Sequence, residues 1–440
     1  MGSIQSGTTN GRAATRAVAL VGPAGTGKTS LAEALLFASG TINRQGSVEA
    51  GTSLGDSSAE ARSRGGSTEL NLMHFEYMGD RFALIDTPGG AGFAADGLAA
   101  LQSADLALVV IDPAPERAAL AEPVLRRLDE LGLPHVIVIN KIEHARAGTV
   151  HALITELQPM SREPLALRQI PIREGDAVVG YVDLALERAY RYRPGKESER
   201  VEIPGELAAL EQQDRSHLLE TLADFDDALM EALLMDETPD QATVMADLAA
   251  DTRANKVVPV VLCSALGDGG VHRLLKLLRH EAPSPDTAAA RMGLREGGAF
   301  HVFKVSNSGA MGRLALGRVL GAALDEGDEL EVAGTLERTG SLFLVQGEKT
   351  AKQHSARVGD VIAIARLEGA GSGMVLPRKG ARCAEAPAPV YPPRNAAIAI
   401  TTRDRKDDGK LSTALHRLCE EDPALEWSQD DASHETLLRW

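Results

Sequence analysis

The sequence predicts an α/β domain with a mostly parallel sheet and helices on both faces, followed by an antiparallel β-barrel and a partial α+β domain. Three observations predict this order. Across residues 17–285, short aliphatic runs alternate with helical patterns, as in parallel sheets covered by helices. Beyond a linker rich in Pro and Ala, alternating patterns and tight Gly turns indicate a barrel. After a second Pro-rich linker, one strand pattern and one helix pattern remain.

The apolar runs of the first domain have the length of strands. The expected strands are residues 17–21, 82–85, 106–111, 135–139 and 257–262. Between the last two lies an insertion, about residues 157–255, which is too long for a plain loop. It has its own strand pattern at 178–184 and an acidic amphipathic helix around 219–234. We therefore expect a first domain over residues 17–285 that contains an inserted subdomain.

The remaining segments are smaller. Residues 298–377 form the expected barrel, and residues 394–440 form the partial domain, with a strand at 396–401 and a helix at 410–420. At the other end, residues 1–16 are rich in Ser, Thr, Gly and Asn and have no apolar stretch. This composition predicts a disordered tail.

Composition excludes several classes of function. The chain of 440 residues has 46 basic and 62 acidic side chains, a net charge of −16, so we expect no non-specific binding of nucleic acid. Cys263, Cys383 and Cys419 are far apart and lack metal-ligand spacing, which indicates reduced thiols in a cytoplasm. The longest apolar runs are strand-sized, so we expect no membrane partner and a soluble, cytoplasmic protein.

The segment from Gly22 to Thr29 reads Gly-Pro-Ala-Gly-Thr-Gly-Lys-Thr, follows a predicted strand and opens a predicted helix. This is the context of the GxxxxGK[ST] phosphate loop. Amides of the loop and the helix end would surround the β-phosphate, Lys28 would bridge the β- and γ-phosphates, and the Thr29 hydroxyl would bind Mg²⁺. The expected phosphate-binding residues are Gly22, Gly25, Thr26, Gly27, Lys28, Thr29 and Ser30.

Three further motifs follow predicted strands in order. Asp86-Thr87-Pro88-Gly89 supplies a carboxylate for the metal and, at Gly89, an amide for the γ-phosphate, although alone it is also a plausible turn. Asn140-Lys141-Ile142-Glu143 stands where a guanine-reading Asn-Lys-x-Asp would sit, and Ser264-Ala265-Leu266 where a backbone amide meets the guanine carbonyl. Because all four motifs lie at carboxyl ends of strands, they predict one site for GTP or GDP with Mg²⁺. Its expected catalytic residues are Lys28, Thr29, Asp86 and Gly89.

The order of these motifs resembles that of the translational GTPases, and the later segments resemble elongation factor G. Residues 169–172, 180–184 and 222–227 resemble the subdomain inserted in that factor, residues 312–328 its second domain, and residues 416–425 the start of its third. The resemblance implies a P-loop GTPase fold, Mg²⁺-dependent GTP binding and the ribosome as a partner. Because the family continues through a fourth and a fifth domain, we expect this chain to lack the later domains needed for translocation.

The sequence departs from the family at two catalytic segments. The family's Asp-Thr-Pro-Gly-His has a histidine that positions the attacking water, and Gly90 stands in its place. Losing such a group costs about 10² to 10⁴ in rate, so we expect slow hydrolysis. The family's switch sequence Arg-Gly-Ile-Thr becomes Arg-Gly-Gly-Ser at residues 64–67. Either Ser67 or Thr68 could then bind Mg²⁺.

The guanine-reading motif departs as well. The Asp of Asn-Lys-x-Asp accepts bonds from guanine N1–H and the exocyclic amine, whereas Glu143 places its charge one methylene further out. We expect this change to weaken guanine preference without creating adenine preference, because adenine N1 has a lone pair that a carboxylate repels. The alternative, that Glu143 is a solvated loop acid, stays open.

Three functions fit these observations. The first is a GTP-binding, Mg²⁺-dependent elongation factor G-like GTPase that acts at the ribosome. The second is a hydrolysis-impaired regulatory module that binds guanine nucleotide, which Gly90 and the altered switch favour. The third, a P-loop kinase for small molecules, is disfavoured because the barrel and the guanine motifs have no place in it. Ribosome-stimulated turnover would separate the first two.

Overall fold

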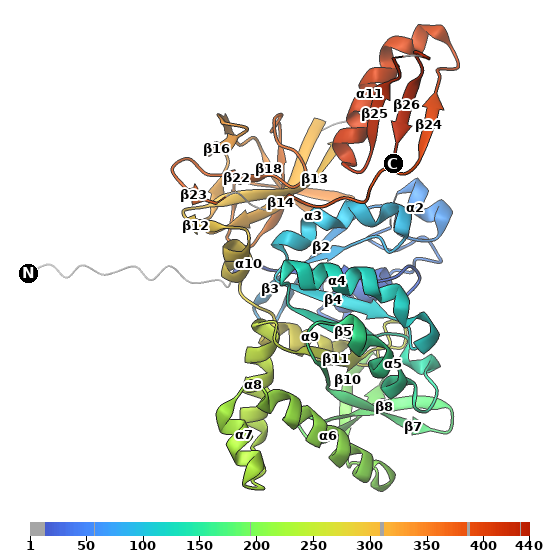
Figure 1. Cartoon of the computed structure of the whole chain (residues 1–440), viewed down its shortest axis with the longest axis vertical. Helices are drawn as coiled ribbons and strands as arrows, with labels where there is room; N and C mark the ends of the chain where they lie inside the picture. Colours follow the sequence, from blue (N-terminus) through green and yellow to red (C-terminus); the bar gives the residue numbers. More distant parts are fainter. Residues whose placement is uncertain (1–13, 57, 194, 309–311, 385–387, 432) are drawn as a thin grey trace, which may run out of the picture.

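The computed structural model describes residues 14–440 apart from residues 57, 194, 309–311, 385–387 and 432. Figure 1 shows the parts of the chain stacked along one long axis, with the inserted subdomain at the bottom, the central sheet in the middle, and the barrel and C-terminal segment at the top. The predicted fold class is confirmed, since a mostly parallel sheet with helices on both faces precedes antiparallel sheets.

The central sheet has seven strands in the order β2-β3-β1-β4-β5-β11-β6. The predicted strands appear as β1 (Arg16–Val21), β3 (Asp80–Asp86), β4 (Leu106–Ile111), β5 (His135–Ile139) and β11 (Val258–Leu262). Two edge strands were not predicted: β2 (Asn71–Tyr77) is antiparallel to β3, and β6 (Leu165–Leu167) is parallel to β11. Polar residues interrupt the apolar ones in β2, and β6 is too short to show a pattern.

Helices cover both faces of this sheet. Val18 and Leu20 of β1 belong to one buried cluster, and Ala19 and Val21 belong to another, because alternate residues of a strand point to opposite faces. Burial on both faces explains why the strands read as continuous apolar runs. No helix among the described residues is both long and apolar enough to cross a membrane. The covering helices are α1 (Lys28–Ala38) and α9 (Val271–Glu281) on the first face, and α3 (Leu98–Ser103), α4 (Glu122–Leu131) and α5 (Thr149–Leu157) on the second.

The inserted subdomain is a four-stranded antiparallel sheet followed by helices. The single helix predicted around residues 219–234 is wrong, because the chain breaks there into two helices. Asp226 has extended backbone and accepts hydrogen bonds from the amides of Ala228 and Leu229, which starts a new helix. The elements are β7 (Gln169–Glu174), β8 (Ala177–Asp183), β9 (Arg188–Arg193), β10 (Lys196–Val201), α6 (Ala208–Ala223), α7 (Asp227–Leu234) and α8 (Gln241–Arg253).

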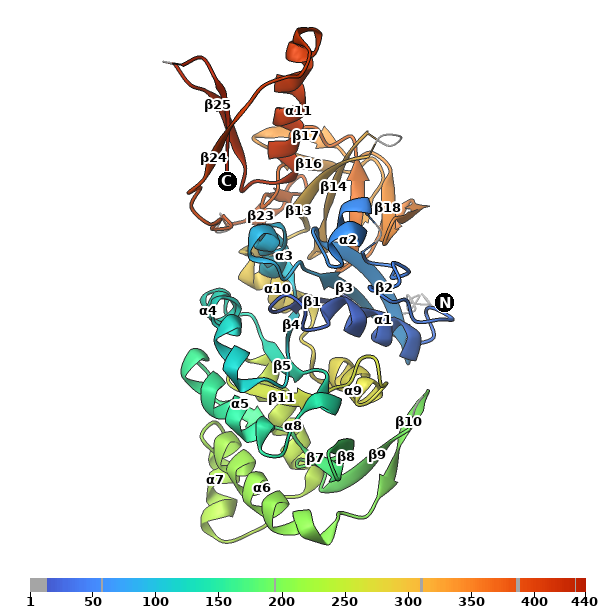
Figure 2. The same ribbon diagram turned by 90° about the vertical axis from the view of Figure 1, so that its right-hand side faces the viewer.

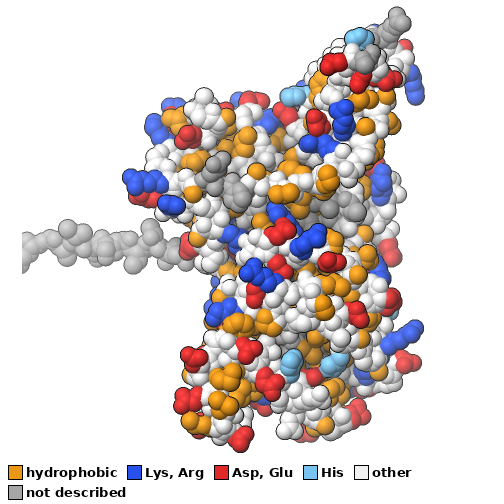
Figure 3. Space-filling view, in the orientation of Figure 1, with side chains coloured by type: hydrophobic (Ala, Val, Ile, Leu, Met, Phe, Trp, Pro, Cys, Tyr) orange, Lys and Arg blue, Asp and Glu red, His pale blue; other side chains and the backbone are white. Residues whose placement is uncertain are grey.

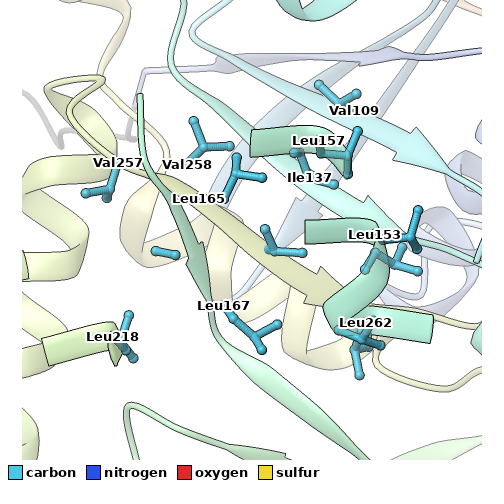
Figure 4. Close-up of a cluster of buried hydrophobic side chains, with 14 of the residues drawn as sticks. Val109, Ile137, Leu153, Leu157, Leu165, Leu167, Leu218, Val257, Val258 and Leu262 are labelled. Carbon is cyan, nitrogen blue, oxygen red and sulfur yellow. The ribbon is translucent and has the colours of Figure 1, made fainter. Parts of the chain in front are cut away.

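The insertion shares a core with the central sheet. Figure 4 shows Leu165 and Leu167 of β6 and Leu218 of α6 in one cluster with Ile137 of β5 and Leu157 of α5. All of these side chains are buried. The insertion is therefore packed against the sheet and is not a freely hanging loop.

The barrel is built around a six-stranded antiparallel sheet in the order β19-β18-β21-β14-β13-β22. Its interior is an aliphatic cluster with Phe300. Short two-stranded sheets extend it: β12 with β23, β15 with β20, and β16 with β17. The strands are β12 (Leu294–Glu296), β13 (Ala299–Ser308), β14 (Gly312–Leu320), β15 (Leu324–Asp325), β16 (Glu329–Val332), β17 (Thr335–Arg338), β18 (Leu342–Gln346), β19 (Lys349–Gln353), β20 (Ser355–Ala356), β21 (Val361–Ala365), β22 (Val375–Pro377) and β23 (Arg382–Cys383).

The C-terminal segment packs one helix against a small sheet. Strands β24 (Ala397–Ile400), β25 (Glu426–Gln429) and β26 (Thr436–Arg439) lie in the order β24-β26-β25 beside α11 (Asp408–Glu421). The end of α11 reaches the barrel, where Glu421 accepts a hydrogen bond from the Asn307 amide at 2.7 Å.

A buried ion pair joins the barrel to the first domain. Arg318 donates to both carboxylate oxygens of Asp105, at 3.0 and 2.5 Å, and neither side chain is exposed. Thr15 is also buried and donates to Asp360 of the barrel at 2.5 Å. Thr15 and Arg16 were placed in the predicted tail, yet this contact and the start of β1 at Arg16 order them; residues 1–13 of that tail lie outside the described residues.

Candidate nucleotide-binding site

The loop between β1 and α1 turns sharply at glycine positions. Gly22 has φ 132° and Gly27 has φ 89°, both in the region that favours glycine. A Cβ atom on Gly22 would collide with the Val110 carbonyl, and one on Gly27 would lie 2.5 Å from Asn140 Nδ2. Helix α1 then begins at Lys28. The loop therefore places its amides at a helix N-terminus, where phosphate binds readily.

Lys28 lies inside this loop. Its Nζ donates to the carbonyl oxygens of Gly22 and Pro23, at 2.9 and 3.0 Å, and burial lowers its pKa. Gly89 lies directly over the same loop, since a Cβ there would be 2.8 Å from the Ala24 amide nitrogen and in collision with Lys28 Nζ. Lys28 and Gly89, which the sequence placed at the γ-phosphate, thus lie together.

Thr29, Asp86 and Ser67 meet beside the phosphate loop. Thr29 Oγ1 donates to Asp86 Oδ2 at 2.7 Å and lies 3.0 Å from Ser67 Oγ. Of the two switch candidates, Ser67 is therefore the one whose hydroxyl meets Thr29, and Thr68 is the next residue along. Asp86 is fully buried, and this burial raises its pKa to about 7. Its Oδ1 has no hydrogen-bond partner within the described chain.

Asp56 joins this cluster and was missed by sequence analysis. It is 3% exposed, its Oδ1 accepts from Asn71 Nδ2 at 3.3 Å, and its Oδ2 has no partner among the residues that the structure covers. Burial raises its pKa, and a hydrogen bond with Ser67 opposes the rise. No periodic pattern marks the segment around it, so only the three-dimensional arrangement reveals this buried acid.

These residues fit Mg²⁺ bound together with a nucleotide. Two buried carboxylates, Asp56 and Asp86, each have one oxygen without a donor, and two hydroxyls lie beside them. In the part of the chain that is described, no group of three or more His, Cys, Asp or Glu side chains is arranged to hold a metal. Mg²⁺ usually takes one or two protein ligands and fills its other positions with phosphate oxygens and water.

Gly90 occupies the position of the missing histidine. A Cβ on Gly90 would lie 3.3 Å from Phe93 Cδ2. Apart from the two residues next to Gly90 in the sequence, the Phe93 ring is the one described group within 4 Å of that Cβ. The Arg64 guanidinium lies over that ring, 5.5 Å from its centre. An aromatic ring thus lies beside this position, and it cannot accept a proton from water.

Asn140 links the base-binding motifs to the phosphate loop. It is 1% exposed, its Nδ2 donates to Thr26 O at 2.9 Å, and its Oδ1 accepts from the Ala265 amide at 3.0 Å. Lys141 adds a second link, because its Nζ donates to Gly25 O at 2.5 Å. Three of the four predicted motifs therefore meet at one end of the site, and the fourth, at Asp86, lies at the other.

The remaining predicted base-binding residues surround this junction. Ser264 Oγ accepts from the Gly267 amide at 3.1 Å, which shapes the loop after β11. Leu266 is 71% exposed, and Ser30 follows Thr29 in the first turn of α1. Glu143 is partly exposed, yet its Oε2 is buried and has no partner within the described residues. One of its oxygens therefore faces inward, which a solvated loop acid would not require.

Comparison with known proteins identifies the families that this chain resembles. Residues 13–284 match the elongation factor Tu GTP-binding domain, and residues 390–439 match domain III of elongation factor G. An elongation factor G-like protein of Synechocystis sp. is 37% identical over 430 residues, covering 96% of this chain and 63% of the relative. Another from Mycobacterium tuberculosis is 30% identical, covering 99% of this chain and 65% of the relative.

A solved structure shows the same fold. A crystal structure of a Thermus thermophilus protein superposes with a TM-score of 0.85 at 31% identity, covering 98% of this chain and 64% of that one. The chain spans a little under two thirds of the length of these relatives. The match over most of its length shows that this chain belongs to the translational GTPases with an elongation factor Tu-type GTP-binding domain, as an elongation factor G-like member.

Proposed function

We propose that this chain binds GTP and GDP with Mg²⁺, hydrolyses GTP slowly, and acts in the cytoplasm at the ribosome as an elongation factor G-like GTPase. The observation that supports the nucleotide and metal most strongly is the contact of Thr29 with both Asp86 and Ser67 beside the phosphate loop. Hydroxyls and carboxylates at a helix N-terminus suit a magnesium–phosphate complex.

Each residue near the phosphates has a distinct role in this proposal. Lys28 exchanges its bonds to loop carbonyls for bonds to the β- and γ-phosphates. The Thr29 and Ser67 hydroxyls face the metal, and Asp86 orients Thr29 through its hydrogen bond. Gly89 lies close enough to the loop for its amide to approach the γ-phosphate. Mg²⁺, when bound, neutralises the charge that develops on the phosphate oxygens.

Slow hydrolysis follows from Gly90 in this proposal. The phosphate and metal contacts stabilise charge in the transition state, but Gly90 cannot orient or deprotonate the attacking water. The ribosome is proposed as a partner because the relatives are named as elongation factors. Any contact with RNA would have to be local, because the chain has a net charge of −16 and acidic and basic side chains are interspersed on the face in Figure 3.

Single-turnover hydrolysis of GTP, with and without ribosomes, tests this proposal. We expect a slow intrinsic rate, ribosome stimulation, and tighter binding of GDP than of ADP on the same preparation. Tight guanine binding without any turnover would replace the GTPase with the regulatory module. Equal affinity for GDP and ADP would contradict the assignment of the base-binding motifs.

A further inference from the structure

Side chains from other segments hold the carbonyl oxygens of the phosphate loop. Lys141 Nζ donates to Gly25 O at 2.5 Å, and Arg117 Nη2 donates to the preceding carbonyl, Ala24 O, at 3.4 Å. The carbonyl that follows these two accepts from Asn140. Three successive peptide groups of the loop are therefore held from outside, and two of the three donors are cations.

One carboxylate, that of Asp112, pairs with both cations. Strand β4 lies between β1 and β5 (Figure 2), and Asp112 follows β4 directly. Its Oδ2 accepts from Arg117 Nη1, which belongs to the 3₁₀ helix Pro115–Ala121. Its Oδ1 lies 3.2 Å from Lys141 Nζ, and this contact is an ion pair, because Oδ1 accepts no hydrogen bond from the described residues. The Asp112 side chain is 9% exposed, so water and salt screen these contacts only weakly.

Peptide geometry connects these outer contacts to the proposed phosphate site. The peptide groups of the loop are trans, and in a trans peptide the C=O and the N–H of the next residue point in opposite directions. Cations on the carbonyls of Ala24 and Gly25 therefore turn the amides of Gly25 and Thr26 to the opposite side. Gly25 has φ 79°, a conformation that lets successive amides form a concave site for an anion. A cation on the carbonyl oxygen also polarises the peptide group, which makes its N–H a stronger donor.

We propose that Asp112 is a positioning residue for phosphate binding: its carboxylate keeps Arg117 and Lys141 on the two loop carbonyls and so keeps the two amides turned toward the phosphates. This inference rests on the proposed nucleotide function and adds a residue outside the four sequence motifs. Without the carboxylate, the two cations would repel each other and leave the carbonyls, since their side chains are 44% and 35% exposed. The sign of the effect is diagnostic, because an acid that acted only by its charge would repel bound phosphate.

The test measures the affinity of the full chain for inorganic tripolyphosphate and for GDP by titration calorimetry. Asp112→Asn keeps the shape of the side chain and removes its charge. We expect both dissociation constants to rise about 10-fold, roughly the contribution of one charged hydrogen bond to phosphate. Tighter binding would show that Asp112 acts by repelling phosphate, and unchanged binding would show that its charge has no role. Either result would overturn the proposal.

Two further variants separate positioning from packing and from net charge. Arg117→Gln changes an exposed side chain and leaves the core untouched; we expect it to weaken tripolyphosphate binding about threefold, and to have a smaller effect when Asp112→Asn is already present. Fully additive losses would overturn the proposal. Glu130→Gln is the matched control, because it removes one negative charge from an ion pair with Arg127 on α4, and both constants should stay unchanged. An equal loss in Glu130→Gln would attribute the effect to net charge and would also overturn the proposal. Wild-type chain that binds neither ligand would instead refute the proposed function.

Discussion

The two halves of the nucleotide site are built in different ways. The phosphate half consists of one loop and the ends of neighbouring strands in the GTPase domain, with Lys28, Thr29 and Asp86 close together. The base half is braced from outside the central sheet, because the inserted subdomain contacts the loop after β11 through Gly195 and Tyr192. The comparison indicates that the proposed phosphate-binding residues are held by local contacts, whereas the proposed base-binding loop also depends on packing of the inserted subdomain.

Replacing Lys28 should have the largest effect on ligand affinity, because nucleotide and free polyphosphate both depend on its contacts to phosphate. We expect Lys28→Ala to weaken GTP and inorganic tripolyphosphate alike, by about 1,000-fold, because two charged hydrogen bonds of about 1.5–3 kcal/mol each are lost. Titration calorimetry with both ligands measures this loss. Lys276→Ala, which removes an exposed ion pair with Glu197, is the matched control and should keep tripolyphosphate affinity. Retained tripolyphosphate binding in Lys28→Ala would place the phosphates elsewhere.

Asp86 should make the phosphate half sensitive to pH when nucleotide is absent. Burial raises its pKa to about 7, so the folded state holds a proton that the unfolded state, with a usual value of 3.8, has released. Its contribution to the free energy of unfolding therefore falls as pH rises from about 4 to about 7, by on the order of 2–4 kcal/mol.

Denaturant unfolding of the nucleotide-free chain at several pH values checks this dependence. We expect Asp86→Asn to flatten the pH profile between about 4 and 7, because the amide does not titrate. GDP with Mg²⁺ should also flatten it in the wild-type chain, since a cation favours the ionised carboxylate. The idea fails if the free energy of unfolding of Asp86→Asn falls with rising pH as steeply as that of the wild type.

Gly90→His should restore a catalytic group to the phosphate half. A Cβ at this position would lie in tight contact, 3.3 Å from Phe93 Cδ2, so the ring would have to shift by a few tenths of an ångström. We expect the single-turnover rate of GTP hydrolysis to rise about 100-fold, the lower end of the range for a general acid–base group. Gly90→Ala should leave the rate unchanged. An equal increase in both variants would attribute the gain to backbone stiffening.

The same contrast explains what could be predicted from sequence. The phosphate loop, Asp86 and Asn140 belong to short motifs that follow strands, so their meeting point follows from the parallel sheet. Asp56 could not be found this way, because it reaches the site from a segment whose position depends on long-range packing. The edge strands β2 and β6 were missed for a related reason, since their pairing with β3 and β11 defines them more than their own residues do.

The smallest expected effect isolates the base half. Asp268→Ala removes the acceptor of the Gly195 amide and so loosens the inserted subdomain from the loop after β11. We expect GDP affinity to fall about two- to fivefold, because an exposed hydrogen bond contributes about 0.5–1 kcal/mol, while tripolyphosphate affinity stays unchanged. Asp268→Asn keeps an acceptor and should bind GDP nearly as well as the wild type. Tripolyphosphate affinity that falls in step with GDP affinity would show that the two halves are coupled through the loops that Asn140 joins. The contacts of the inserted subdomain would then support phosphate binding as well as base binding.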